Sequence, residues 1–263
     1  MGQYSKCEID GHLCLVTINR PEVYNALHPM ANEELSAAFD EFAANPQLWV
    51  AIITGAGDKA FSAGNDLKYH AELRAKTGGR PQSPAKGFGG LTNRHDLDKP
   101  VIAAVNGVAM GGGFEIALAC DIIIASDRAK FALPEPRVGL AALAGGVHRL
   151  PRQIGLKRAM GMILTARHVS AKEGHELGFV NEVVPSGEAL AAAERWAETI
   201  AKNSPMSIRA SKQAIQRGLE VSLEQAMAEQ REYPAVKAMA ASQDYIEGPK
   251  AFSEKRPPKW LGR

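Results

Sequence analysis

The spacing of hydrophobic side chains changes along this chain, and in the first segment they alternate with polar ones as in a β-strand. Two such runs, Tyr4 to Ile9 and His12 to Asn19, flank an Asp10-Gly11 pair. This pattern predicts a β-hairpin with a two-residue turn. Cys7 and Cys14 would then face each other, and we interpret them as packed thiols because direct cross-strand pairs have poor disulfide geometry.

After the hairpin, helical and strand-like spacing take turns. Apolar residues recur at helical intervals from about Pro29 to Ala44. Continuous apolar runs at Val50 to Thr54 and Val101 to Val105 predict buried strands, and a shorter strand is expected at Asp121 to Ala125. A helix is expected at Phe114 to Ala119. This order predicts an α/β fold.

From about residue 186 onward the pattern is almost entirely helical, with alanine-rich amphipathic runs. The change from alternating strands and helices to helices alone predicts an appended module. We therefore expect a core of residues 1–190 and a helical C-terminal module of residues 191–263. Such a module could cover the mouth of a site or form a subunit interface.

Composition narrows the class of protein without identifying it. The 263 residues are 45% hydrophobic and 23% charged, with a formal net charge of +2. These values indicate a globular protein and give no electrostatic reason to expect nucleic-acid or membrane partners. The sequence shows no signal peptide, no stretch that could span a bilayer and no C-x-x-C pair among its three cysteines. We expect a cytoplasmic protein.

The segment at 106–115, NGVAMGGGFE, is the strongest candidate for a reaction centre. Three glycines let the backbone approach a ligand closely, and the helix that follows begins with unpaired N–H groups. Glu115 lies within one turn of these groups. An anion-stabilising turn beside a carboxylate suits a reaction in which negative charge develops and a proton moves.

A second glycine turn repeats this arrangement upstream. The strand at Val50 to Thr54 continues through Gly55-Ala56-Gly57 to the segment FSAGNDL at 61–67, where another helix is expected to begin. Two such turns could direct two backbone N–H groups at one oxygen atom. The alternative is that both turns are only tight corners.

Three further segments surround these turns. Phe131 to Glu135 is predicted to be a short extended segment that carries a second carboxylate, and Gly145-Gly146 is predicted to precede a helix. The stretch 76–90, KTGGRPQSPAKGFGG, is predicted to be a mobile surface loop. Alternatively, Glu115 could only satisfy a helix dipole, and Glu135 could be an exposed loop acid.

These motifs resemble the crotonase family, the enoyl-CoA hydratase/isomerase superfamily, over nearly the whole chain. The resemblance rests on the segments 61–67, 106–115 and 131–139, and extends from Asn19-Arg20-Pro21 to the tail at 252–256. It implies a superhelix of strand–strand–helix turns with a helical C-terminal part, in a trimer or hexamer. It also implies an acyl-CoA substrate whose thioester oxygen accepts hydrogen bonds from the N–H groups of Asn65 and Gly112.

In family hydratases two glutamates hold one water, and Glu115 and Glu135 match both positions. The resemblance implies that Glu115 activates the water and that Glu135 delivers a proton to Cα. Two neighbouring carboxyls in an apolar pocket should not both ionise easily, so one pKa should be abnormally high. Retention of both acids favours an enoyl-CoA hydratase. An enoyl-CoA isomerase, which needs the Glu135-type acid alone, and a carnitinyl-CoA dehydratase-like enzyme remain alternatives.

The resemblance implies no separate cofactor, because coenzyme A is part of the substrate. Its nucleotide would be bound by Ala63, Asn65 and Leu67, and by Phe252 and Lys255 of a neighbouring subunit. Lys255 could equally belong to a solvated basic tail. The sequence departs from the family at Asn65, where many hydratases have Ala, and at 140–144, so straight-chain substrates are not assured.

The same residues bear on two non-enzymatic alternatives and on a metal site. RNA binding should come with a basic helix, but the helix after Pro29 carries Glu33, Glu34, Asp40 and Glu41 and no Lys or Arg. Acyl-CoA binding without catalysis would leave the paired glutamates without a use. The seven histidines are scattered, so the sequence predicts no metal site.

Overall fold

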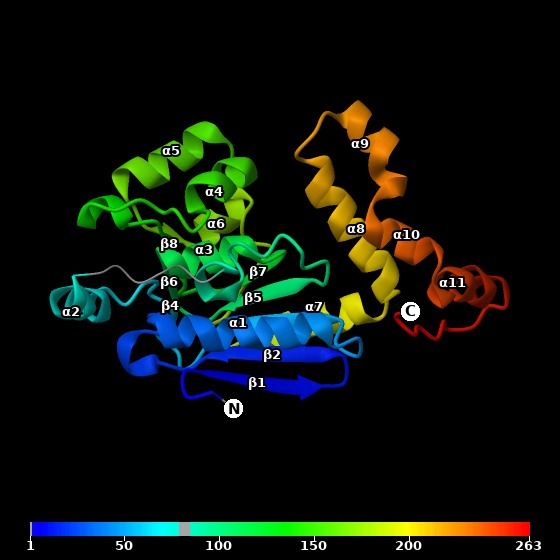
Figure 1. The fold of residues 1–263 in the computed structure, drawn as a ribbon, viewed down its shortest axis with the longest axis horizontal. Coiled ribbons are helices and arrows are strands. Elements are labelled where there is room, and N and C mark those ends of the chain that lie inside the picture. Colours follow the sequence, from blue (N-terminus) through cyan, green and yellow to red (C-terminus); the bar gives the residue numbers. More distant parts are fainter. Residues whose placement is uncertain (1, 79–84) are drawn as a thin grey trace.

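The computed structural model describes residues 2–78 and 85–263 as strands and helices arranged around two sheets (Figure 1). The strands are β1 (Ser5–Asp10), β2 (Leu13–Ile18), β3 (Val50–Gly55), β4 (Ala60–Ser62), β5 (Val101–Val105), β6 (Val108–Met110), β7 (Ile122–Ser126), β8 (Lys130–Ala132), β9 (Val169–Ser170) and β10 (Glu182–Val184). The α-helices are α1 (Pro29–Ala44), α2 (Leu67–Thr77), α3 (Gly112–Ala119), α4 (Gly146–Ile154), α5 (Leu156–Thr165), α6 (Ala171–Leu177), α7 (Ala189–Ala201), α8 (Pro205–Gly218), α9 (Leu223–Glu229), α10 (Pro234–Ala240) and α11 (Gln243–Ser253). Short 3₁₀ helices are η1 (Pro21–Val23), η2 (Phe88–Gly90), η3 (Glu135–Val138) and η4 (Gln230–Glu232).

The larger sheet has the strand order β1-β2-β3-β5-β7-β10, and the smaller has the order β4-β6-β8-β9. Only the pairs β1–β2 and β8–β9 are antiparallel among these neighbours. Strands β3 and β5 are buried along their whole length, as their continuous apolar runs predicted. The α/β class expected from the sequence is confirmed.

The two faces of the larger sheet pack against different helices. Ala51 and Ile53 of β3 point into the main core with Phe39 and Phe42 of α1. The alternate residue Ile52 lies in a second apolar cluster with alanines of α7. This alternation is the two-residue period of a strand, and it explains why β3 is apolar at every position.

The N-terminal hairpin forms, but its turn lies one residue later than the sequence predicted. Asp10 pairs with Leu13, so the loop residues are Gly11 and His12, and Gly11 has φ +54°. A glycine with positive φ at the first loop position fits a two-residue hairpin turn. Cys7 consequently lies diagonal to Cys14 and not opposite it. Both remain free thiols, with their sulfur atoms 3.2 Å apart.

The surface loop expected at 76–90 is wrong at both ends of the segment, and its middle is not tested. Helix α2 continues to Thr77, and the middle of the segment lies outside the described residues. Its end is buried: Gly90 packs against the backbone of α1 and Gly89 against Ile116 of α3, and the Gly89 N–H donates to Oδ1 of Asn32 at 2.7 Å. Gly90, one of the glycines that indicated a surface loop, instead allows a close approach between its backbone and that of α1.

Helices α8 to α11 project from the sheet-containing body on the side away from α2 (Figure 1). Helix α7 precedes them and covers the larger sheet, contacting β3, β5 and β7. A division of the chain at residue 190 stays a prediction. In the described part of the chain, no helix is both long enough and apolar enough to cross a membrane.

Asn25 holds the segment between β2 and α1 against β4. Its side chain is fully buried, accepts a bond from the Arg20 N–H at 2.9 Å, and donates to the carbonyls of Ala56 and Ala60 at 3.0 and 2.8 Å. Its φ of +55° is a left-handed conformation that asparagine tolerates better than most residues. Two residues further along the chain, Leu27 forms a parallel bridge with Asn65.

Replacing Asn25 with Ala should lower the free energy of unfolding by about 2–4 kcal/mol, because buried carbonyls lose their donor and alanine must adopt a positive φ. Asn25→Gly removes the same hydrogen bonds without the conformational strain, so it should be about 1 kcal/mol less destabilised. Urea unfolding measures both. A stability within about 0.5 kcal/mol of the wild type for Asn25→Ala would contradict this account.

Candidate active site

Glu115 is a buried carboxyl in the first turn of α3. Its side chain is 3% exposed, and Oε1 accepts a hydrogen bond of 2.9 Å from the backbone N–H of Gly146. Gly146 opens α4, which confirms the helix predicted after Gly145-Gly146. A β-carbon at Gly146 would lie 3.1 Å from Cγ of Glu115, so a larger residue there would crowd the glutamate side chain.

Glu135 lies at the start of η3 and not in an extended segment, which corrects the sequence-based expectation. Pro134 has φ −83° and ψ 7°, and Pro136 follows at a position where proline favours a helical turn. The turn places Oε1 of Glu135 against Gly111, 2.8 Å from where a β-carbon would be. Oε2 is buried and has no hydrogen-bond partner among the described residues. Glu135 is therefore not an exposed loop acid.

The environment of both carboxyls favours their neutral forms. Burial, followed by repulsion from Glu135, raises the pKa of Glu115 to about 7, while the Gly146 N–H works in the opposite direction. Burial also raises the pKa of Glu135. The sequence predicted one abnormally high pKa, and the structure raises both. A carboxyl that titrates near neutral pH can take up and release protons under physiological conditions.

The two predicted glycine turns touch each other. Gly64 has φ +86°, and a β-carbon there would lie 2.7 Å from the amide nitrogen of Gly112. The bridge to Leu27 uses the Gly64 carbonyl and the Asp66 N–H, which leaves the Asn65 N–H outside it. Within the described ranges, neither the Asn65 N–H nor the Gly112 N–H has an acceptor. Two unpaired amides next to two carboxyls can bind one oxygen atom of a ligand.

The helix predicted to begin at the end of the 61–67 segment is α2, which starts at Leu67. Asp66 caps α2 by accepting from the Tyr69 N–H at 3.1 Å, and it pairs with Arg20 at 3.0 Å. The pKa of Asp66 is lowered because these bonds outweigh its burial. Arg20 also donates to the Ala26 carbonyl. Through these contacts and the bridge between Leu27 and Asn65, the segment at 19–27 fixes the position of Asn65.

The structure brings only part of the predicted coenzyme A site together. Ala63 and Leu67 flank Asn65 in the same turn. Phe252 lies at the end of α11, 87% exposed, and Lys255 follows that helix with φ +53°. Helices α2 and α11 lie at opposite ends of the molecule (Figure 1). Within one chain, Phe252 and Lys255 therefore do not reach the other residues.

Sequence reasoning missed Phe88. A β-carbon at Gly112 would come within 2.5 Å of the Phe88 ring, so this half-buried ring lies directly beside the predicted amide donor. Its backbone N–H donates to Oγ1 of Thr92 at 2.7 Å. The only indication in the sequence was the run Gly-Phe-Gly-Gly around Phe88, which was interpreted as part of a loop.

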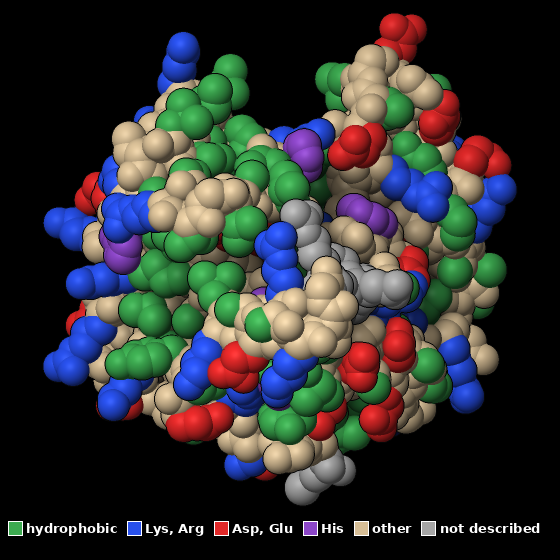
Figure 2. Space-filling view, turned by 60° about the vertical axis from the view of Figure 1, so that its left-hand side comes forward, with side chains coloured by type: hydrophobic (Ala, Val, Ile, Leu, Met, Phe, Trp, Pro, Cys, Tyr) green, Lys and Arg blue, Asp and Glu red, His purple; other side chains and the backbone are tan. Residues whose placement is uncertain are grey.

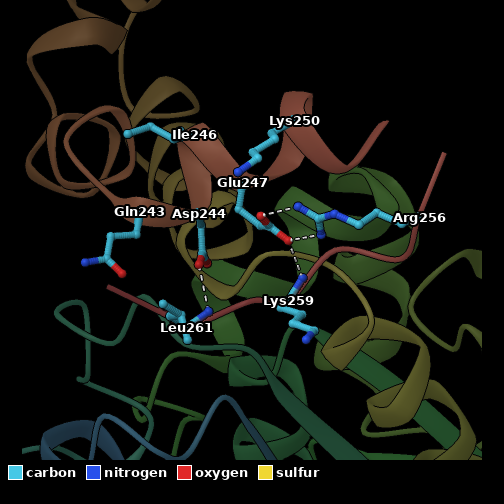
Figure 3. A pocket seen from close by; sticks show the side chains of 8 residues that line it. All are labelled: Gln243, Asp244, Ile246, Glu247, Lys250, Arg256, Lys259 and Leu261. Atoms are coloured by element: carbon cyan, nitrogen blue, oxygen red, sulfur yellow. Dashed lines mark hydrogen bonds and ion pairs between the residues drawn. The ribbon is translucent and has the colours of Figure 1, made fainter. Parts of the chain in front are cut away.

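A separate cavity of about 550 Å³ lies between α11 and the C-terminal tail (Figure 3). Within it Arg256 pairs with Glu247, and buried Asp244 accepts a hydrogen bond from the Leu261 N–H at 2.8 Å. This cavity does not include the two glutamates. Within the described residues, no group of three or more His, Cys, Asp or Glu side chains could hold a metal ion.

Comparison with known proteins identifies the class to which this fold belongs. A crystal structure of an enoyl-CoA hydratase from Mycobacterium tuberculosis H37Rv superposes with a TM-score of 0.92 at 37% identity, covering 100% of both chains. An enoyl-CoA hydratase from Bacillus anthracis gives a TM-score of 0.89 at 35% identity, covering 99% of this chain and 100% of that one. The fold is that of the crotonase superfamily, as the resemblance implied.

Sequence comparison places the chain within that class. The sequence profile of the enoyl-CoA hydratase/isomerase family matches residues 8–263, and the chain belongs to this family. A carnitinyl-CoA dehydratase from Proteus mirabilis is 42% identical over 258 residues, covering 96% of each chain. One from Escherichia coli K12 is 43% identical over 259 residues, covering 97% of each. Enzymes of this superfamily act on acyl-CoA thioesters.

Replacing Glu115 with Gln should stabilise the protein, increasingly so as the pH rises. Native Glu115 keeps its proton up to about pH 7, whereas the ordinary value of 4.5 applies to the unfolded chain. The native state therefore binds the extra proton between these values, and wild-type stability falls across that window as the pH increases. Glutamine keeps an acceptor for Gly146 and does not titrate. Its advantage should grow by at most about 3 kcal/mol from pH 4 to pH 8.

Urea unfolding at pH 4, 6 and 8 measures this difference. Glu176→Gln on the surface of α6 is the matched control, because Glu176 is exposed, and its effect should not change with pH. A Glu115→Gln effect that is the same at all three pH values would show that burial does not hold the proton on Glu115.

Proposed function

We propose that this protein is an enoyl-CoA hydratase that adds water across the 2,3 double bond of a 2-enoyl-CoA thioester, and that it also catalyses the reverse dehydration. The thioester oxygen accepts hydrogen bonds from the N–H groups of Asn65 and Gly112. One water lies between Glu115 and Glu135. Coenzyme A enters as part of the substrate, and the reaction needs no further cofactor.

The proposed chemistry follows the charges. Glu115, ionised, takes a proton from the water as its oxygen bonds to Cβ. Electron density moves through Cα to the thioester oxygen, where the two amides stabilise the negative charge; loss of one such donor typically costs about 3 kcal/mol. Glu135, protonated, delivers its proton to Cα. The proton gained by Glu115 then passes to Glu135, so one water is consumed in each turnover.

The buried Oε2 of Glu135 supports this assignment most directly. A buried carboxyl oxygen without a protein partner is rare in folded proteins and requires a ligand or water to satisfy it. The raised pKa of Glu115, about 7, suits a base that must release its proton again at neutral pH. Binding of an acyl-CoA without catalysis would leave both features without a use.

A carnitinyl-CoA dehydratase-like activity is the second candidate. Two relatives with that name are 42% and 43% identical to the chain over almost its full length. Dehydration of a carnitinyl thioester is the same chemistry run in the opposite direction, with a trimethylammonium group on the acyl chain. The half-buried Phe88 ring beside Gly112 favours this candidate, because an aromatic face attracts such a cation.

The protein is further proposed to form a trimer or hexamer. Apolar side chains are exposed on α5, at Leu156 and Leu164, just after α8, at Leu219, and on α9, at Leu223, each between 63% and 79% exposed. The lobes that carry α5 and α9 border a hollow in the surface (Figure 2). A neighbouring subunit would cover these faces and bring its own Phe252 and Lys255 to the nucleotide. Sedimentation of the purified protein measures the subunit number.

The hydratase proposal is tested by following hydration of trans-2-butenoyl-CoA and of its 4-trimethylammonio derivative. Glu115→Gln and Glu135→Gln should each lower kcat by about 10²–10⁴-fold, the usual contribution of a general acid or base. Glu176→Gln is again the matched control and should keep full activity. The ratio of kcat/KM values for the two substrates separates the hydratase from the carnitinyl candidate.

Two results would contradict the proposal. An isomerase would keep much of its double-bond-shifting rate in Glu115→Gln, because it needs Glu135 alone. A binding protein would take up both thioesters, detected by calorimetry, and return them unchanged.

A further inference from the structure

Arg149 packs against the Gly145-Gly146 turn, which binds the Glu115 carboxyl. Its backbone N–H donates to the Gly145 carbonyl at 2.8 Å, and its guanidinium folds back over Gly145 so closely that a β-carbon there would overlap Nη1. The neighbouring Gly146 N–H is the one that binds the Glu115 carboxyl. The guanidinium therefore covers the outer side of the carboxyl's binding turn.

The same side chain also bridges to the Phe88 segment. Nη2 of Arg149 donates to the Thr92 carbonyl at 2.8 Å, while Oγ1 of Thr92 accepts from the Phe88 N–H at 2.7 Å. Arg149 thus connects the turn beneath Glu115 with the segment that places a ring beside Gly112. One residue ties together two walls of the proposed site.

Arg149 has no ion-pair partner within 4.0 Å among the described residues. A guanidinium that is largely buried without a carboxylate is unfavourable, and burial lowers its pKa. Compensation comes through space from Glu115, whose negative charge, when it is ionised, raises that pKa. The hydrogen bond to Thr92 contributes to folding, but the unpaired charge itself does not.

The charged groups around Glu115 give Arg149 a specific electrostatic role. Glu135, on η3, raises the pKa of Glu115, whereas Arg149, on α4, lowers it. The other elements packed closely on α3 are β4, β6 and η2, and their sequences AFS, VAM and FGG contain no charged residue. Arg149 therefore opposes the repulsion between the two glutamates.

We propose that Arg149 is a positioning residue for the hydration reaction, which holds the turn under Glu115 in place and favours the ionised form of that carboxyl against the repulsion of Glu135. It does so through the turn and through its charge, without touching the substrate. This role rests on the proposed function, since it presumes that Glu115 is the base.

Arg149→Met, which removes the charge and keeps the bulk, should move the acidic limb of the kcat/KM profile to higher pH. Glu115 would need a higher pH to ionise, and the expected shift is about 0.5–1 pH unit. Arg149→Lys keeps a charge and should bring the limb back towards the wild-type position. Arg152→Met removes an exposed charge from the same helix and should leave the limb unchanged.

A second measurement needs no turnover. The infrared band of a protonated carboxyl that disappears in Glu115→Gln reports the titration of Glu115 directly. In Arg149→Met this band should persist to higher pH than in the wild type, by the same shift. If the wild type hydrates no thioester but the band shifts, the hydratase proposal fails while the action of Arg149 on Glu115 stands.

An infrared titration within about 0.2 pH unit of the wild type in folded Arg149→Met would overturn the proposal. An equal shift in Arg149→Lys would also do so, because the charge would then be irrelevant. Should the Met variant not fold, Arg149→Gln replaces it, since its amide can still donate to the Thr92 carbonyl without carrying a charge.

Discussion

The contact between two glycine turns is the constraint on which the site depends. Gly64 approaches the start of α3 so closely that any side chain would meet the Gly112 nitrogen and the Met110 carbonyl, at 2.7 and 2.6 Å from its β-carbon. The proposed pair of amide donors, Asn65 and Gly112, requires this close approach of the two turns. The two sheets, the buried Asn25 and the Arg20–Asp66 pair all serve to hold this contact.

The carboxyls behind that contact show a conflict between stability and reactivity. Glu115 is almost fully buried, and Glu135 carries a buried oxygen without a protein partner. Burial makes each harder to ionise, which destabilises the folded chain at neutral pH. It also brings the pKa of Glu115 to about 7, near the working range of an acid–base catalyst. The Gly146 N–H and the unpaired Arg149 then limit how far the pKa of Glu115 rises. Folding alone would not favour such an arrangement.

Sequence periodicity could predict what depends on local spacing. The helix at Pro29–Ala44 and the strand at Val101–Val105 appear with the predicted bounds, because the helix has a continuous apolar face and the strand is apolar at every position. Features set by neighbours distant in sequence were missed: Phe88 gains its place from α1 and Gly112, and Arg149 from Thr92. The roles of Glu115 and Glu135 came from family resemblance, and the structure adds their burial and proximity to the amides.

The most direct test of the two-glutamate account follows where solvent atoms go. The wild type would be incubated with trans-2-butenoyl-CoA and, separately, with its 4-trimethylammonio derivative, in D₂O enriched in ¹⁸O, and the products analysed by mass spectrometry. The account predicts that at least one thioester gains an ¹⁸O hydroxyl at Cβ together with a deuteron at Cα in the same molecule. Deuterium at Cα without oxygen at Cβ would show proton shuttling by one acid alone, and would contradict it.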